Sequence, residues 1–328
     1  MRALVVTNMW PSDDAPQRGI FVADQVAALR RRRDVEVDVA AFSPGPRALA
    51  RAIATMRRRT RGARYDVVHA HFGLSALPAL AAQRGPVVVT LHGNDLFVRR
   101  SRLVTRAALP FTALPAVVSR AFGANLPGAG TSRRVAVLPV GIATERFRPI
   151  PRAEARARLG LDPDGPYLLF PHDPARPLKG FDRAQEAAAG ATLLTMGRVP
   201  PEEVPYWINA ANAVLVPSHD EGFGLAVIEA LACDVPVLAT PVGIHPVALG
   251  GIAGTLCEPW SPARWRAALR PVLDAADPRV AGRARAELFS ADRMAERVVE
   301  AWRAVQSPGS GTYTRVFECV GDGAPDRL

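Results

Sequence analysis

The chain has 328 residues, 48% of them hydrophobic and 22% charged, with a formal charge of +10. That composition excludes a largely disordered chain, and the length favours two domains of roughly 150 residues over a single core. The positive charge favours anionic partners such as nucleotides, phosphates, nucleic acid or anionic lipid. Three cysteines without C-x-x-C spacing indicate neither a disulfide framework nor a zinc site, so a reducing cytoplasm is expected.

Short apolar runs rich in Val and Leu alternate with helical stretches through the first half of the chain. The runs begin at residues 3, 35, 66, 86, 116 and 135. Buried strands that alternate with helices predict a parallel sheet covered on both faces, so residues 1–150 are expected to form a Rossmann-like domain. The first run is too short for a signal peptide, and no run approaches the roughly 18 apolar residues of a spanning helix.

The second half repeats this alternation, with apolar runs that begin at residues 167, 191, 213, 235 and 254. A stretch rich in Pro and Arg separates the halves and predicts a linker, with the domain boundary between residues 145 and 165. Residues 151–305 are therefore expected to form a second Rossmann-like domain. Gly, Ser and Pro crowd together without periodicity near the end of the chain, which predicts a loosely ordered tail over residues 306–328.

The stretch at residues 218–232 reads SHDEGFGLAVIEALA and predicts a loop that runs into a helix. Gly222 and Gly224 allow a close backbone approach, and the helix N-terminus offers free N–H groups to a phosphate or a sugar hydroxyl. Glu221 lies in the loop and Glu229 about one turn inside the helix. At that separation they need not form the acid and base pair of a glycosidase. Each can instead bind a different diol, one on a sugar ring and one on a ribose.

With its flanks, this motif resembles glycosyltransferase family 4, whose hallmark E-x7-E matches Glu221 to Glu229. The resemblance covers residues 1–305 and is closest to a bacterial branch that glycosylates cell-wall polymers or secondary metabolites. It implies the α/β GT-B fold, two Rossmann-like parallel-sheet lobes facing a cleft. It also implies that Glu221 contacts donor-sugar hydroxyls and Glu229 the nucleotide ribose, while the amides around Phe223 to Leu225 contact sugar and phosphate.

A second segment, DPARPLKG at residues 173–180, is similar to the family's donor-phosphate segment. The resemblance implies that Arg176 and Lys179 clamp the diphosphate and neutralise charge on the leaving group. These two residues lie closer together in this sequence than in the commoner family pattern. Two solvated basic side chains at the start of a helix are the alternative interpretation.

Histidines follow two neighbouring runs of the first half. His69 and His71 lie two apart on a predicted strand and so on one face, but no third residue is spaced to complete a metal site. The resemblance places His71 near the reacting sugar. His92 and Asp95 end the next run, where the family lines the acceptor side. They predict either a His–Asp pair that orients a hydroxyl or a turn capped by Asn94 and Asp95.

Arg18 and Gly19 precede a predicted helix and resemble the family's loop that approaches donor phosphate and acceptor. A G-x-G-x-x-G dinucleotide fingerprint is absent there. Three positions depart from the family pattern, since Val140 replaces an Asn, Ala143 replaces an Asp, and His245 stands in a Gly-Gly-x-Pro-Glu segment that lacks its acid. These departures leave the expected fold intact and weaken any inference about the sugar.

The resemblance implies an enzyme, a retaining glycosyltransferase of the hexosyltransferase type. It would move a sugar from a nucleotide diphosphate sugar, of UDP or GDP type, to the hydroxyl of a cell-wall, lipid-linked or natural-product acceptor. No cofactor or metal is expected, because cationic side chains and a helix N-terminus can supply the positive charge. The expected site comprises the catalytic residues His71, Arg176, Lys179 and Glu221, the donor-binding residues Gly19, Gly222, Phe223, Gly224, Leu225 and Glu229, and the acceptor-side residues Arg18, His92 and Asp95.

Two alternatives stay open. Another GT-B activity, such as that of a pseudo-glycosyltransferase, an epimerase or a phosphorylase, would use the two glutamates similarly. A non-enzymatic binder of anionic lipid or nucleic acid is suggested by the Arg-rich stretches at residues 47–64 and 99–102. With only 6% aromatic residues, stacking on bases is disfavoured, so no nucleic acid is expected. The chain is expected in the cytoplasm, with peripheral contact on the inner face of an anionic membrane left open.

Overall fold

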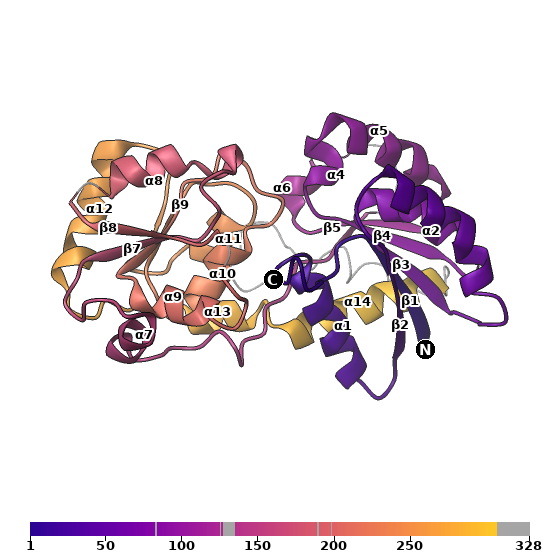
Figure 1. Cartoon of the computed structure of the whole chain (residues 1–328), viewed down its shortest axis with the longest axis horizontal. Coiled ribbons are helices and arrows are strands. Elements are labelled where there is room, and N and C mark those ends of the chain that lie inside the picture. Colours follow the sequence, from indigo (N-terminus) through magenta and orange to yellow (C-terminus); the bar gives the residue numbers. More distant parts are fainter. Residues whose placement is uncertain (83, 125, 127–134, 189, 198, 307–328) are drawn as a thin grey trace. The chain divides into compact units, whose positions relative to one another are not determined.

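The computed structural model describes residues 1–328 except 83, 125, 127–134, 189, 198 and 307–328 (Figure 1). The chain forms two compact units. The first contains Met1–Gly141 and the helix α14 (Ala291–Gln306), and the second contains Ile142–Ser290. Both are parallel α/β units, as the alternation of apolar runs and helices predicted.

The first unit is built on a parallel sheet with the strand order β2-β1-β3-β4-β5-β6. Its strands are β1 (Arg2–Thr7), β2 (Glu36–Ala41), β3 (Val67–His71), β4 (Val87–Leu91), β5 (Leu114–Val117) and β6 (Ala136–Val137). β1 pairs with β2 on one side and with β3 on the other. The chain therefore reverses its direction of travel across the sheet between β1 and β3, and ligands of such sheets bind at the carboxyl ends of the strands at this switch point.

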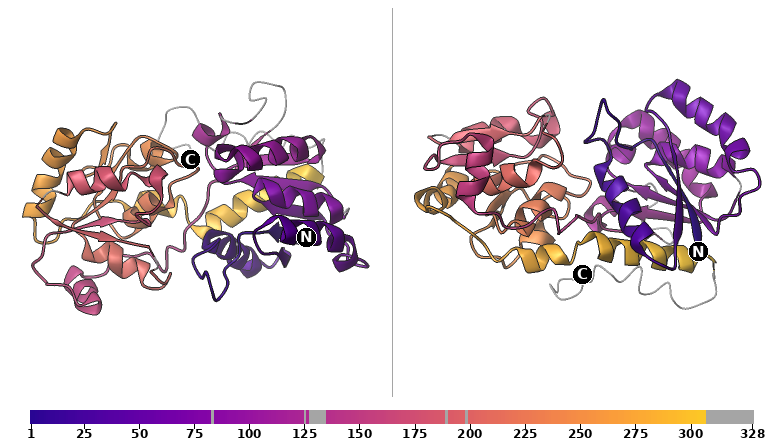
Figure 2. Two further views of the ribbon diagram at one scale, coloured as in Figure 1. Left: turned by 45° about the horizontal axis from the view of Figure 1, so that its top comes forward. Right: turned by 60° about the horizontal axis from the view of Figure 1, so that its bottom comes forward.

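Helices cover both faces of this sheet (Figures 1 and 2). One face carries α1 (Ile20–Arg31) and α14, which share a core with the strands. The helices α2 (Pro46–Arg59), α3 (Ala76–Ala82) and α5 (Arg99–Ala108) pack in sequence against one another. Short elements fill the remaining connections: η1 (Gly73–Ser75), α4 (Asn94–Phe97), η2 (Leu109–Phe111) and α6 (Arg120–Gly123).

Helix α14 belongs to the first unit, whereas the sequence analysis assigned residues 291–305 to the second domain. Its apolar stripe, which includes Met294, Val298 and Trp302, is buried against α1 and the first sheet. An amphipathic stripe must be covered, but its spacing does not say by which sheet. The predicted boundary at residue 150 likewise falls at Gly141 in the structure. The tail was predicted over residues 306–328; Gln306 is the last residue of α14, and the rest of the tail lies outside the described residues.

The second unit has the strand order β11-β10-β9-β7-β8. Its strands are β7 (Tyr167–Phe170), β8 (Thr192–Thr195), β9 (Ala213–Val216), β10 (Val237–Ala239) and β11 (Leu256–Cys257). Its helices are α7 (Arg152–Leu159), η3 (Pro177–Lys179), α8 (Phe181–Ala187), α9 (Val204–Ala210), α10 (Leu225–Ala232), α11 (His245–Leu249), α12 (Pro262–Asp274) and α13 (Arg283–Glu287). β7 pairs with both β8 and β9, so the switch point of this sheet lies between β7 and β9.

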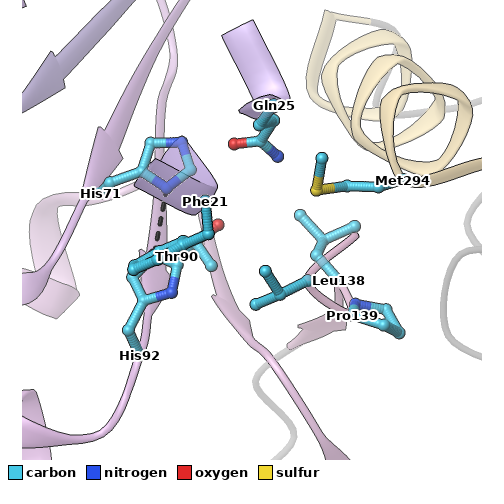
Figure 3. Close-up of a pocket in the computed structure, with 9 residues that line it drawn as sticks. Phe21, Gln25, His71, Thr90, His92, Leu138, Pro139 and Met294 are labelled. Carbon is cyan, nitrogen blue, oxygen red and sulfur yellow. Dashed lines mark hydrogen bonds between the residues drawn. The ribbon is translucent and has the colours of Figure 1, made fainter. Parts of the chain in front are cut away.

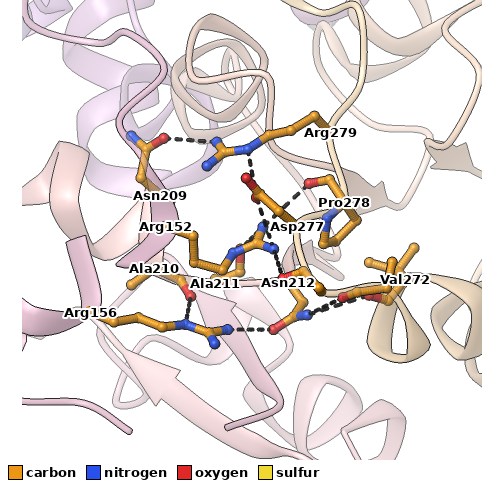
Figure 4. Close-up of polar contacts among 12 residues, drawn as sticks. Arg152, Arg156, Asn209, Ala210, Ala211, Asn212, Val272, Asp277, Pro278 and Arg279 are labelled. Carbon is orange, nitrogen blue, oxygen red and sulfur yellow. Dashed lines mark hydrogen bonds and ion pairs between the residues drawn. The ribbon is translucent and has the colours of Figure 1, made fainter. Parts of the chain in front are cut away.

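Buried arginines hold the second unit together at the ends of its helices (Figure 4). Arg152 is 4% exposed and donates to the carbonyls of Ala211 and Ala276, both at 3.0 Å. Arg156 is 3% exposed and donates to the carbonyl of Ala210 at 3.0 Å. The last carbonyls of a helix have no partner within it, so these guanidinium groups complete the end of α9, and Arg152 also holds the segment that follows α12. The Arg-rich stretch predicted as a linker thus supplies structural contacts to the second unit.

Candidate active site

The switch point of the second unit holds a buried ion pair. Lys179 follows β7 and Glu221 follows β9, and their Nζ and Oε2 atoms are 2.6 Å apart. The two side chains are only 9% and 7% exposed. The hydroxyl of Ser218 donates to the other carboxylate oxygen at 2.8 Å. The structure therefore brings together two residues that the sequence assigned to separate tasks, one on the diphosphate and one on the sugar.

Electrostatics keep this pair ionised. Burial alone would raise the pKa of Glu221, but the charge and hydrogen bond of Lys179, together with the adjacent His172 and His245, outweigh burial and hold the pKa below its ordinary value. Burial also lowers the pKa of Lys179, opposed by the charge of Glu221. Lys179 is the only lysine in the chain, since every other basic residue among the 41 is arginine. Its ammonium is a compact charge with three rotatable donors, unlike the planar fork of a guanidinium.

Arg176 does not join this pair. It lies three residues before Lys179, where its backbone begins the short turn η3, and its side chain is exposed. The structure thus distinguishes the two cations of the DPARPLKG segment. Lys179 is fixed at the end of the sheet, and Arg176 is on the surface beside it.

Glycines set the loop that carries Glu221. Gly180 has φ of 70°, and a Cβ there would lie 2.4 Å from the carbonyl oxygen of Pro217. Gly243 has φ of 59°, and a Cβ there would lie 2.3 Å from the carbonyl oxygen of Phe223. The Phe223 ring is buried and packs edge-on against Phe289 at 6.0 Å. The side chain of Phe223 is therefore part of the core, which leaves only its backbone for a ligand.

Helix α10 begins directly after this loop. Its N-cap is Gly224, with φ of 109° and no side-chain cap, and Leu225 is the first helical residue. The first N–H groups of a helix have no partner within it and form the positive end of its dipole. Gly222 precedes the cap, and Glu229 lies one turn into the helix with its side chain partly buried. The predicted glycine-rich approach to a helix N-terminus is thus present.

Two histidines beside Glu221 were not assigned a role from the sequence. His172 lies two residues beyond β7, with Nε2 at 3.9 Å from a Glu221 oxygen. The Nδ1–H of His245 donates to the carbonyl of Thr240 at 2.8 Å. Both Nε2 atoms are buried and lack a hydrogen-bond partner within the described part of the chain. A histidine placed just after the strand at a switch point is the signal that could have indicated His172.

Both histidines are neutral at neutral pH. Burial lowers the pKa of His172 to about 3 and lowers the pKa of His245 below its ordinary value. In the neutral form of His245, Nδ1 carries the proton, so Nε2 is a hydrogen-bond acceptor. A Cβ at Gly224 would lie 2.4 Å from this Nε2, which places the imidazole directly against the backbone that leads into α10.

In the first unit, His69 is a structural residue. The indole N–H of Trp302 donates to His69 Nδ1 at 3.0 Å, and indole is a donor only. Nδ1 therefore carries no proton, and the Nε2–H of His69 donates to the hydroxyl of Thr90 at 2.7 Å. This fixed tautomer joins α14 to β3 and β4. It leaves His71 as the histidine of this strand that is available for chemistry.

His71 and His92 form a hydrogen-bonded pair of imidazoles, with Nδ1 of the first 3.0 Å from Nε2 of the second. Burial lowers the pKa of His71 to about 3 and the pKa of His92 well below its ordinary value. Both rings are therefore neutral, and the N–H of one ring donates to the nitrogen of the other. The other nitrogen of His71, Nε2, is buried and has no partner among the described residues. Both rings line a small pocket with Gln25 and Met294 (Figure 3).

Asp95 is a backbone cap and does not pair with the His92 side chain. Its carboxylate accepts the N–H groups of Gly73, of His92 at 2.5 Å and of Gly93 at 3.0 Å. Burial raises the pKa of Asp95 to about 6, opposed by these N–H donors. Of the two interpretations drawn from the sequence, the capped turn is the one that the structure shows. Asp95 thereby joins the segments that follow β3 and β4.

Gly19 and Arg18 begin helix α1. Gly19 is its N-cap with φ of 65°, and a Cβ there would lie 2.2 Å from the carbonyl oxygen of Met9. Only glycine allows the loop after β1 to pass this close to the helix. Arg18 is exposed next to it. The loop therefore lies at the carboxyl end of β1, beside the switch point of the first sheet.

The described residues contain no group of three or more His, Cys, Asp or Glu side chains that could hold a metal ion. They also contain no helix long and apolar enough to cross a membrane.

The fold is that of the two-unit GT-B class. Sucrose-phosphate synthase from Thermosynechococcus elongatus has a TM-score of 0.74 at 19% identity, over 94% of this chain and 99% of that chain. HepE from Anabaena, in a crystal structure described as a complex with UDP, has a TM-score of 0.68 at 16% identity, over 93% and 100% of the two chains.

Sequence comparison then gives the family. The model described as Glycosyltransferase Family 4 matches residues 3–146, and the model described as Glycosyl transferases group 1 matches residues 175–287. D-inositol 3-phosphate glycosyltransferase 1 of Catenulispora acidiphila is 34% identical over 299 residues, which are 73% of this chain and 70% of the relative. The chain belongs to glycosyltransferase family 4. It spans 49% of the length of the relative from Segniliparus rotundus, at 33% identity over 224 residues and 56% of this chain.

Proposed function

We propose that this protein is a retaining glycosyltransferase that moves a sugar from a nucleotide diphosphate sugar to an acceptor hydroxyl. The observation that carries the proposal is the buried pair of Lys179 and Glu221 at the switch point of the second sheet, directly before the N-terminus of α10. Membership of glycosyltransferase family 4 supports sugar transfer. The structure of HepE, described with UDP and with UDP-glucose, supports UDP, ahead of GDP, as the first nucleotide to test.

In this proposal the donor diphosphate binds where positive charge converges. The N–H groups of residues 223–225 and the helix dipole stabilise the phosphate oxygens. Lys179 adds a full charge and stabilises the leaving nucleoside diphosphate as the sugar bond breaks. Exposed Arg176 is free to approach the same oxygens from the surface. With these groups in place no metal or cofactor is needed for charge neutralisation, and Glu229 on α10 accepts hydrogen bonds from the ribose.

Glu221 binds the hydroxyls of the transferred sugar. One of its oxygens faces Lys179 and the other accepts from Ser218, but a carboxylate has about four lone-pair positions. His172 and His245 each present an unpartnered Nε2 near this carboxylate and Gly224. A hydroxyl-rich sugar satisfies such buried polar atoms, whereas an apolar ligand leaves them unpaired at a cost.

In the first unit His71 is proposed to bind a hydroxyl near the reacting carbon. His92 fixes its ring through the Nδ1 hydrogen bond, and Asp95 fixes the turn that carries His92. A neutral imidazole with a pKa of about 3 orients the hydroxyl without acting as a cation. The acceptor proton passes to a donor phosphate oxygen, so the new bond forms on the face that the nucleotide leaves. Arg18 and Gly19 contribute the loop after β1.

The acceptor is proposed to be a hydroxyl compound. The relatives are named D-inositol 3-phosphate glycosyltransferases, which makes this phosphate ester the first acceptor to test. A single hydroxyl or methyl group changes acceptor specificity by a few kcal/mol. Cell-wall, lipid-linked and natural-product acceptors are therefore the next to test. The proposed setting is the cytoplasm.

A thermal-shift screen of UDP, GDP, TDP, ADP and CMP without added metal tests the donor site. A nucleotide at 100 times its Kd stabilises the native state by about 2.7 kcal/mol, so one nucleotide should raise the unfolding midpoint. Glu229→Ala should abolish the rise. Glu186→Ala, which removes an exposed carboxylate from α8 of the same unit, should keep it. No rise with any nucleotide, from a folded sample, contradicts the proposal.

The single lysine allows a second readout. The primary amines of this sequence are those of Lys179 and of Met1, so an amine-selective acetylating reagent should label these two positions. A bound nucleotide diphosphate should slow acetylation of Lys179 and leave the rate at Met1 unchanged, as measured by mass spectrometry of the two peptides. Equal rates at Lys179 with and without a saturating nucleotide contradict its proposed place on the diphosphate.

A further inference from the structure

Helix α5 and the short η2 turn expose large apolar side chains to solvent. Among the described residues the exposed large hydrophobic side chains are Val98 (45%), Leu103 (62%), Phe111 (74%), Leu178 (50%) and Val247 (37%). The first three fall within residues 98–111. A scattered apolar side chain on a surface needs no explanation, but a cluster does.

The same segment is strongly basic. Arg99, Arg100, Arg102 and Arg106 are all exposed, and the sequence contains no Asp or Glu between residues 96 and 144. Within the described part of the chain, none of the four forms an ion pair. They differ from Arg152 and Arg156 of the second unit, whose guanidinium groups are buried on carbonyls.

The inner side of α5 is fixed to the first unit. Thr105 and Ala108 are buried, and the Thr105 side chain packs against Gly73 of η1 so closely that a Cβ there would clash with it. The helix is therefore held on one side while the other side presents arginines with interleaved apolar residues. We define the α5 surface as Val98, Arg99, Arg100, Arg102, Leu103, Arg106 and Phe111.

We propose that the α5 surface docks the protein on an anionic lipid bilayer. The arginines bind lipid phosphates, and Phe111 and Leu103 insert at the boundary between headgroups and acyl chains. Basic segments gain about 1 kcal/mol per Lys or Arg near an anionic membrane, and exposed Phe and Leu add apolar area that water no longer contacts. Nucleic acid fits less well, because Phe111 is the single aromatic of this surface and Leu103 cannot stack on a base.

This docking does not depend on the sugar-transfer proposal. The chain reaches α5 seven residues after His92, at the carboxyl end of β4. If the first unit binds the acceptor there, which rests on the proposed function, a docked α5 surface favours an acceptor with a lipid moiety. The docking itself is measured without donor or acceptor.

Flotation of the full chain with vesicles tests the proposal. Vesicles of phosphatidylcholine alone are compared with vesicles of equal parts phosphatidylcholine and phosphatidylglycerol. The protein should float only with the anionic vesicles. Arg102→Glu with Arg106→Glu should weaken binding by about 25-fold or more, from about fivefold for each arginine. Phe111→Ser with Leu103→Ser should weaken vesicle binding by about 10-fold or more. It should also abolish the vesicle binding that remains at high salt.

The matched control lies on α2. Arg51→Glu with Arg58→Glu makes the same charge change at two exposed positions of a basic helix that exposes no large apolar side chain among those given above. The affinity of this variant for anionic vesicles should fall by about threefold or less, because only long-range attraction changes. Circular dichroism and the nucleotide thermal shift on the same samples separate misfolding, or failure of the donor site, from loss of docking.

Three results overturn the proposal. The wild type does not float with anionic vesicles at low salt. Alternatively, the α5 and α2 charge variants lose the same amount of vesicle binding, and the Phe111 and Leu103 variant loses none. The attraction would then depend on net charge alone. Finally, single-stranded DNA or an acidic protein binds the same α5 residues more tightly than lipid does and displaces the chain from the vesicles.

Discussion

Removing the charge of Lys179 is the sharpest perturbation of the second unit. In Lys179→Met the Glu221 carboxylate, 7% exposed, keeps only the Ser218 hydroxyl as a close donor. Breaking a buried ion pair by removing one partner costs about 3–5 kcal/mol, a large part of the 5–15 kcal/mol that stabilises a typical domain. We expect the free energy of unfolding to fall by about 3 kcal/mol at neutral pH.

The double variant Lys179→Met with Glu221→Gln should recover most of this loss, because no buried charge remains. The pH dependence should differ as well. In the wild type the lowered pKa of Glu221 contributes stability above the ordinary value of 4.5, which is lost as pH falls through the folded value. In Lys179→Met the largest effect that opposes burial is gone, so the pKa of Glu221 should rise. Acidification towards that pKa should then narrow the difference in free energy of unfolding between the variant and the wild type.

Urea unfolding of the full chain, followed by circular dichroism at pH 7 and pH 5, measures these differences. The two single variants and the double variant form a cycle whose coupling energy isolates the pair. A conservative Lys179→Arg variant keeps the charge and tests whether the site accepts a guanidinium, which we expect it not to. Additive effects of the two single substitutions, each below about 1 kcal/mol, refute the reasoning, since that size is typical of exposed pairs.

Three more predictions follow from the described contacts. Gly224→Ala should remove the nucleotide thermal shift, because its φ is 109° and the new Cβ would lie 2.4 Å from His245 Nε2; a normal shift contradicts this. Trp302→Phe should lower the free energy of unfolding by about 1–3 kcal/mol, measured in urea, since buried His69 Nδ1 loses its donor; an unchanged value contradicts it. Stability should fall as pH drops below 6.5, because the unfolded chain binds a proton that buried His71 refuses until about pH 3. Each such histidine contributes up to about 1.4 kcal/mol per pH unit in urea titrations, and a flat profile from pH 6.5 to 5 contradicts the burial.

Much of the fold followed from the sequence because the strands of parallel sheets are continuous apolar runs. ALVVT in β1 (Arg2–Thr7) and YLLF in β7 (Tyr167–Phe170) are such runs, each followed by a helical stretch, and that alternation predicts parallel pairing. Helix α14 was assigned to the wrong unit because its stripe specifies burial and not the surface that provides it. The burial of this stripe against α1 and the first sheet, and the hydrogen bond of Trp302 to His69, show that the chain returns to the first unit.

The candidate site was predictable where a motif fixes local geometry and unpredictable where topology does. The glycines around Phe223 indicated a backbone approach to a helix. The burial of Lys179 against Glu221 depends on β7 lying beside β9, which no local pattern states. The donor to Asp95 was equally hidden, since its carboxylate could accept a hydrogen bond from a side chain or from a backbone N–H with the same spacing.

The most direct test of the central claim is product analysis by NMR and mass spectrometry, with UDP- and GDP-sugars offered together with D-inositol 3-phosphate and a panel of hydroxyl acceptors. We predict a glycoside that keeps the anomeric configuration of the donor, formed by the wild type and not by Lys179→Arg. An inverted product, or transfer that proceeds at an equal rate in Lys179→Arg, would contradict the claim that Lys179 and Glu221 form the donor site of a retaining glycosyltransferase.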